Sequence, residues 1–225
     1  MALSQPSYIK VKNVASYDLG KMWDDIRASD DFKFDSSKIL EQSLLLQPNA
    51  QIALGIGMYE WIFWCFAPHI DRPEPEQVLE AMWCGAYDPK RFTYIEFKRE
   101  EWLGPILGPM WCAMMFATAM VGYREEGEIG LQEGLSYLPR LAVHVLPESQ
   151  PFLEWLDQII DKLKIFYLDI PKDPFENLFE ENDQHPLVPR EVLDPKIDFD
   201  INQTSVFIND FLSKVNPNNP FLKKI

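Results

Sequence analysis

The sequence predicts a mainly α-helical protein: a single helical domain with a few short strands and a C-terminal acidic, proline-containing arm that ends in a helix. Three observations support this. Apolar residues recur at helical spacing along most of the chain, they make up 47% of it, and the acidic residues concentrate near the C-terminus. We expect a helical core domain over residues 1–168, with the arm and last helix, residues 169–225, packed on the same domain. At 225 residues, the chain should bury roughly 70% of the surface of its unfolded form.

The N-terminal region is expected to begin with a strand and continue in helices. Residues 8–14 alternate apolar and charged side chains, which is the period of a short, half-exposed strand. Asp18 can cap a helix with one apolar stripe. Ser36 or Ser37 can cap a second helix that continues to about Leu46.

The longest apolar helix is expected between Ala50 and Ala67, where Glu60 is the exception to an apolar circumference. The Glu60 carboxylate must be paired, hydrogen-bonded or protonated, because burial of a lone charge is costly. Two interpretations stay open: a proton-transfer group, or a structural carboxylate that reaches an arginine or the solvent edge. The next helix should begin around Pro75, and residues 91–98 alternate as a strand does.

Residues 102–123 contain no charged side chain and are long enough to span a bilayer. Glycine–proline pairs at 104–105 and 108–109 should break this segment and leave a helix over about 110–121. We therefore expect a buried helix and no membrane span. An exposed loop should follow over residues 122–134, whereas residues 138–146 fit a strand or a short helix equally well.

The C-terminal third begins with a strongly amphipathic helix and then changes composition. The helix carries Phe152, Leu156 and Ile159 on one face, with Glu154 and Asp157 away from it. Residues 169–200 contain ten acidic and three basic residues, a net charge of −7, which is half of the chain total of −14. Five prolines exclude a long helix there. A last amphipathic helix is expected over about 203–214.

Aromatic residues alternate with carboxylates in the acidic arm, a pattern typical of a protein-binding hot spot with a charged rim. The predicted partner-binding residues are Asp173, Phe175, Glu176, Phe179, Glu180, Glu181 and Asp183. The alternative is that the two phenylalanines hold the arm on its own domain while the carboxylates face water.

Patterns for catalysis and metal binding are not found in the sequence, so we predict no catalytic residue, no metal site and no cofactor. His69 and Asp71 could supply two metal ligands, but no third ligand stands at the right spacing. The three cysteines lie in apolar stretches and are interpreted as small buried apolar residues. No secretory signal is visible at the N-terminus, so we expect a cytoplasmic protein.

The net charge of −14 favours a basic protein as partner and disfavours nucleic acid and anionic membranes. The overall profile resembles that of the acidic immunity proteins of bacterial toxin systems, without a shared motif. We therefore predict an immunity or antitoxin protein, not an enzyme, that blocks the active cleft of a basic toxin domain. The alternatives are an enzyme whose carboxylates converge only in the fold, such as Glu60 with a residue of 69–76, and a scaffold or oligomer subunit.

Overall fold

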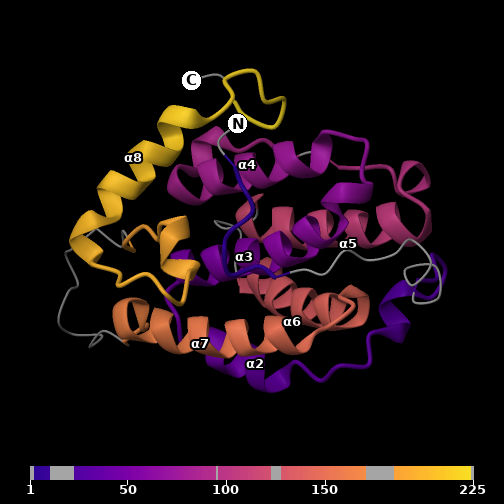
Figure 1. Cartoon of the computed structure of the whole chain (residues 1–225), viewed down its shortest axis with the longest axis horizontal. Helices are drawn as coiled ribbons and strands as arrows, with labels where there is room; N and C mark the ends of the chain where they lie inside the picture. The colour runs from indigo at the N-terminus through magenta and orange to yellow at the C-terminus, as the bar shows by residue number, and fades with distance from the viewer. Residues whose placement is uncertain (1–2, 11–22, 95, 123–127, 171–184, 224–225) are drawn as a thin grey trace.

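Helix α3 forms the centre of the computed structural model, and the other long helices surround it (Figure 1). The structure describes residues 3–10, 23–94, 96–122, 128–170 and 185–223. The prediction of a mainly α-helical protein is confirmed. The α-helices are α2 (Ser37–Ser43), α3 (Pro48–Phe66), α4 (Glu74–Tyr87), α5 (Gly104–Gly122), α6 (Glu128–Val145), α7 (Gln150–Tyr167) and α8 (Thr204–Lys214). Short 3-10 turns are η1 (Ala28–Asp31), η2 (Ala67–His69), η3 (Pro89–Arg91), η4 (Arg99–Glu101), η5 (Arg190–Leu193) and η6 (Ile201–Gln203).

Helix α3 is buried on all sides, as its nearly continuous apolar sequence predicts. Every residue of the helix except Pro48 and Trp64 is buried, including Glu60. It contacts α4, α5, α6 and α7. At Gly57 a Cβ atom would lie 2.8 Å from a Leu193 methyl group and 3.0 Å from the Trp155 ring. The missing side chain therefore lets η5 and α7 approach the α3 backbone closely.

The short strands are not confirmed in the described residues. Tyr8 lies in a turn, and the expected N-terminal strand continues into residues 11–14, outside the described ones. Where a strand was expected over residues 91–98, the structure has an isolated bridge from Phe92 to Leu222, and residue 95 is not described. The Thr93 amide also donates to the Phe221 carbonyl at 2.9 Å, so the C-terminal tail covers this segment.

Two expectations about the middle of the chain were wrong. The helix expected over 110–121 begins at Gly104 and contains Pro109. Because Pro105 stands at the helix start, where amides have no intrahelical partner, it is tolerated, and Pro109 removes one hydrogen bond of an early turn. The loop expected over 122–134 is replaced from Glu128 onward by α6, which continues to Val145, so residues 138–145 are helical.

Two described helices are long and apolar enough to cross a membrane by length and composition. They are Pro48–His69, with 89% of the apolar window buried inside the protein, and Gly104–Gly122, with 50% buried. The first value is that of a core helix, since its apolar surface already contacts other helices. The second helix reaches 19 residues, so the broken-helix argument against a span does not apply to it.

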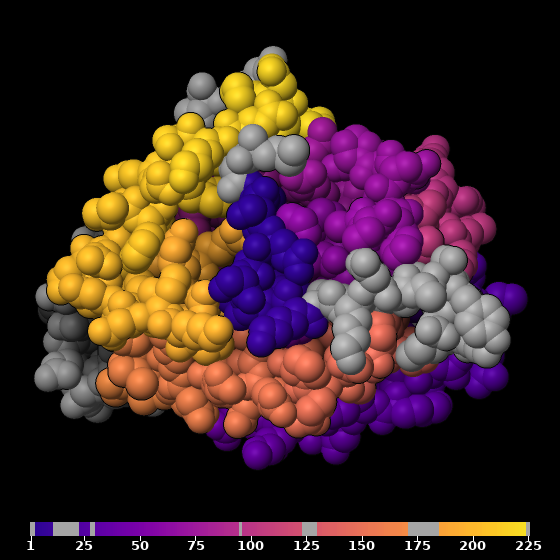
Figure 2. Space-filling model, in the orientation of Figure 1, coloured from indigo at the N-terminus to yellow at the C-terminus, as the bar shows by residue number. Residues whose placement is uncertain are grey.

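Residues 185–223, at the C-terminal end of the chain, pack against the helical core. Val192 and Leu193 of η5 are buried, and Phe199 packs against Phe166 of α7 with ring centroids 5.1 Å apart. Helix α8 follows, as its apolar pattern predicts, and buries Ile208 and Phe211. Residues 185–223 thus contact α3, α4 and α7 at the face where the N-terminal residues 3–10 also lie (Figure 2).

Candidate functional site

The predicted partner-binding residues of the acidic arm, from Asp173 to Asp183, lie outside the described residues. Their assignment therefore stays a prediction. The structure describes the arm again from His185 onward. The backbone carbonyl of His185 accepts a hydrogen bond of 2.8 Å from the side-chain amide of Asn49. Three other features of the described chain could carry a function: a buried ion pair, a small pocket beside it, and a groove between α2 and α7.

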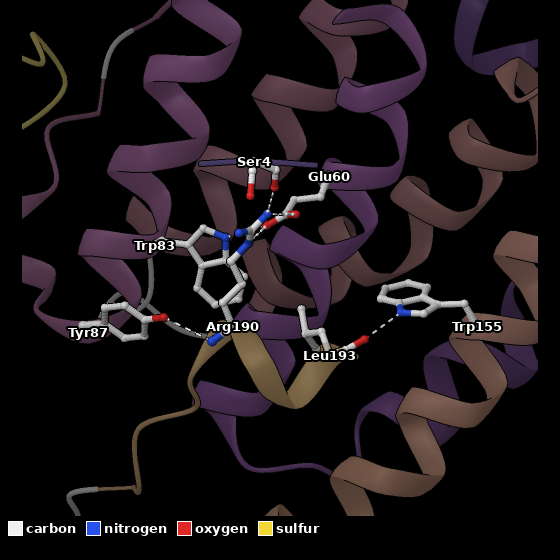
Figure 3. A network of polar contacts seen from close by, with 7 residues as sticks. All are labelled: Ser4, Glu60, Trp83, Tyr87, Trp155, Arg190 and Leu193. Atoms are coloured by element: carbon white, nitrogen blue, oxygen red, sulfur yellow. Dashed lines mark hydrogen bonds and ion pairs between the residues drawn. The ribbon is translucent and has the colours of Figure 1, made fainter. Parts of the chain in front are cut away.

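The buried ion pair joins Glu60 of α3 to Arg190 of η5 (Figure 3). Arg190 donates from Nε to Glu60 Oε1 and from Nη2 to Oε2, each at 2.7 Å. The Trp83 indole nitrogen of α4 also donates to Oε1, at 2.8 Å. Both carboxylate oxygens thus have charge-assisted donors, which compensates for the burial of the charge.

Arg190 connects four segments that are distant in the sequence. Its Nη2 also donates to the Ser4 carbonyl at 2.9 Å, and its backbone amide donates to the Tyr87 hydroxyl at 3.2 Å (Figure 3). Burial lowers the pKa of Arg190, but the Glu60 carboxylate raises it more, so the net shift is upward and the guanidinium stays charged. The cluster therefore holds the N-terminal segment, α3, α4 and η5 together.

This geometry confirms the interpretation that Glu60 reaches an arginine. The side chain has no exposed surface, and both oxygens already accept hydrogen bonds. In the 69–76 stretch, the suggested source of a second catalytic group, Arg72 pairs with Glu74 at 2.8 Å. Sequence reasoning could not select Arg190, because 130 residues separate it from Glu60.

A small pocket of about 120 Å³ opens next to this ion pair. It is lined by Pro6, Ser7, Tyr8, Arg190, Glu191, Asp194 and Ile197. Burial raises the pKa of the Tyr8 hydroxyl well above its usual value, and the Glu60 charge adds to this. Burial also raises the pKa of Glu191. Tyr8 Oη and Glu191 Oε2 are both buried without a hydrogen-bond partner among the described residues.

The Glu191→Gln variant is expected to be more stable than the parent protein at neutral pH, with the gain disappearing in acid. Since burial raises the folded-state pKa of Glu191 above its unfolded value, this carboxyl favours folding at low pH and opposes it once ionised. The amide carries no charge to desolvate. Thermal melting of both proteins across the acid range measures the difference. A gain that is independent of pH would contradict the assignment of the effect to ionisation.

A groove with a volume of about 560 Å³ lies between α2 and α7. Figure 2 shows α7 at the lower front of the molecule with α2 below it. The floor is apolar: Leu156 and Ile160 are buried, and Ile39 and Leu153 are half-buried. The rim is polar, and its residues are Lys38, Gln42, Gln150, Glu154, Asp157, Asp161 and Lys164.

The groove follows from the amphipathic pattern of α7, which the sequence shows. Phe152, Leu156 and Ile159 face the core, so the exposed carboxylates Glu154 and Asp157 are directed outward. The position of α2 beside them was not predictable. It is fixed at one end by an antiparallel bridge between Leu46 and Leu168 and by a hydrogen bond from Lys164 to Gln42.

The histidines and cysteines supply no metal site in the described ranges, where no three His, Cys, Asp or Glu side chains are grouped to hold an ion. The His144 ring packs against Phe32, with centroids 5.2 Å apart. Cys65 and Cys84 are buried and Cys112 is partly buried, close to the expectation, and burial raises the pKa of each thiol to about 12.

Comparisons with known proteins give no match for this chain: no protein-family model, no curated protein and no solved structure matches it. The net charge and the groove are the features of the chain that indicate a function.

Proposed function

We propose that this protein is a stoichiometric inhibitor that binds and neutralises a basic protein partner, as an immunity or antitoxin protein blocks the active cleft of a bacterial toxin. The observation that carries the proposal is the α2–α7 groove, whose apolar floor is bordered on the α7 side by a row of three carboxylates. Apolar contact supplies affinity at such surfaces, while the charges at the rim select a partner of opposite sign.

The net charge supports the same function. The electric field of a protein with a net charge of −14 attracts a basic surface from beyond contact distance and increases the rate of encounter. Half of this excess belongs to residues 169–200, so the acidic arm supplies steering charge. In this proposal the protein acts in the cytoplasm and needs no cofactor. Steric occlusion of the partner, with carboxylates in place of its anionic substrate, provides the inhibition.

Affinity capture from the native host tests the proposal. The tagged full-length chain is expected to retain one basic protein in equimolar amount, and adding the chain to that protein should abolish its activity. Salt should release the partner from the captured chain, because screening weakens the attraction between their opposite charges. An acidic or neutral partner, or a basic partner whose activity is unaffected by the chain, would contradict the proposed function.

Charge reversal in the acidic arm is expected to slow association with such a partner by roughly tenfold or more at low salt. The variant changes Glu176, Glu180, Glu181 and Asp183 to lysine. Stopped-flow association rates measured across a salt series give the effect. The matched control reverses four exposed carboxylates elsewhere, Glu96, Glu100, Glu101 and Glu133, and produces the same change in net charge. If both variants slow association equally, the arm has no special role in steering.

A further inference from the structure

We infer that the α2–α7 groove receives an amphipathic, basic α-helix of the partner protein. This inference rests on the proposed function and names the docking element. Three features of the described residues support it: the dimensions of the groove, the row of carboxylates along α7, and an exposed apolar patch where the groove ends.

The groove has the length of a helix-binding site. Its lining residues on α7 run from Gln150 to Lys164, which corresponds to about 21 Å at the helical rise of 1.5 Å per residue. A partner helix of about four turns would match this length. The half-buried side chains of Ile39 from α2 and Leu153 from α7 provide the accessible apolar contact in the floor. Apolar residues at i, i+3, i+4 and i+7 of a partner helix would fill such a floor.

The charges along α7 specify the polar flank of the partner helix. Glu154, Asp157 and Asp161 stand three and four residues apart, so they lie along one side of the helix. All three are exposed, and Asp161 has 74% of its side chain accessible. Lys164 pairs with Asp161 at 3.4 Å and bonds to Gln42 at the far end of the groove. A flank of lysine and arginine would therefore meet the carboxylate row.

The groove ends at an apolar patch formed by the last turn of α7 and by the residues that directly follow α2 and α7. Nine large apolar side chains are exposed in the described part of the chain, and five of them lie here. These five are Leu44, Leu45, Ile165, Leu168 and Ile170. The Leu46–Leu168 bridge and a hydrogen bond of 2.8 Å from the Asp169 amide to the Leu45 carbonyl hold the two chain segments together. A bulky apolar residue at one end of the partner helix would cover this patch.

Charge complementarity favours this occupant over a second copy of the chain. Two copies placed groove to groove with α7 facing α7 would bring their carboxylate rows together, and in any arrangement each copy carries a net charge of −14. Like charges at short distance oppose such an interface. A basic helix meets the same surface with opposite sign.

The experiment uses the full-length protein and fluorescent synthetic peptides of about 14 residues. The first peptide is amphipathic, with leucines at helical spacing and lysines on one flank. The second has the same composition in an order that breaks the apolar stripe, and the third carries glutamate in place of lysine. We expect anisotropy titrations to show tighter binding of the first peptide than of either control, with helix formation on binding seen by circular dichroism.

A matched pair of variants locates the site. Changing Glu154, Asp157 and Asp161 to lysine is expected to weaken binding of the amphipathic basic peptide roughly tenfold or more. Changing the exposed carboxylates Glu96, Glu100 and Glu133 to lysine alters the net charge equally and should weaken binding by about twofold at most. A Leu45→Ser and Ile165→Ser double variant should also weaken binding, and it leaves the charge unchanged.

The outcomes separate this inference from the proposed function. Two results would overturn the groove as a helix-binding site: equal weakening of binding by both triple variants, or equal affinity for the amphipathic basic peptide and for the basic peptide without an apolar stripe. Either result would still allow a general attraction of this chain to basic proteins. Concentration-dependent self-association that is lost in the Leu45 and Ile165 variant would assign the surface to a second copy and overturn the inference. Failure of every basic peptide to bind, together with capture of no basic partner, would remove the proposed function itself.

Discussion

The Arg190→Met variant is expected to lose about 3–5 kcal/mol of the free energy of unfolding, which is a large share of the total stability of a typical domain. Methionine keeps much of the side-chain volume but removes both hydrogen bonds of 2.7 Å to the Glu60 carboxylate. Glu60 would then keep the Trp83 indole as its described donor while it remains fully buried. Urea denaturation followed by tryptophan fluorescence measures the loss.

The Glu60→Met, Arg190→Met double variant is the control for this result. Replacing both members of a buried ion pair with apolar side chains removes the uncompensated charge, so the double variant should be more stable than Arg190→Met alone. The exposed pair of Lys214 and Asp210 on α8 offers a comparison, and Lys214→Met should cost at most about 1 kcal/mol. A loss that is as small for Arg190→Met as for Lys214→Met would contradict the structural role of the buried pair.

Truncation of Trp155 to alanine is expected to cost about 3–5 kcal/mol, because it opens a cavity where four segments meet. The indole ring of α7 stacks on Tyr8 of the N-terminal segment at 5.8 Å and lies 5.8 Å from the Trp61 ring of α3. Its Nε1 also donates to the Leu193 carbonyl of η5 at 2.9 Å. Chemical denaturation gives the value, and hydrogen exchange should show early opening of residues 185–199.

Substitution of Trp155 by phenylalanine removes the hydrogen bond and keeps an aromatic ring in the site. This variant leaves the Leu193 carbonyl without its indole donor and should cost about 1–3 kcal/mol. Trp64→Phe is the matched control, since the Trp64 indole nitrogen has no hydrogen-bond partner among the described residues and its ring is half-buried. The Trp64→Phe control should lose less of the free energy of unfolding than Trp155→Phe. If the order is reversed, the bond from Trp155 to Leu193 does not hold η5 in place.

Four of the helices could be predicted from their apolar pattern. The residues of α3, α4, α7 and α8 carry continuous or periodic apolar side chains, and each forms a helix close to the expected position. Prediction failed where local signals conflicted with burial. Glycine and proline in 104–109 indicated a break, yet the helix begins at Gly104. Pro105 lies in the first turn, and the burial of Gly108 and Pro109 offsets the hydrogen bond that Pro109 removes.

The candidate groove could also be predicted only in part. The outward row of Glu154, Asp157 and Asp161 could be predicted from the period of α7. The wall formed by α2 could not, because the two helices are more than 100 residues apart and meet through contacts such as that of Lys164 with Gln42. The acidic arm was predicted from composition, and its binding role stays a prediction.

The sequence by itself determined the helical class, the acidity and the need of Glu60 to be paired, hydrogen-bonded or protonated, because each depends on local composition or on the cost of burying a charge. The tertiary structure decided that Glu60 pairs with Arg190 and that α2 and α7 enclose a groove between them. Both depend on contacts between residues far apart in the chain, and such contacts are set by how the helices pack and not by the pattern within any one of them.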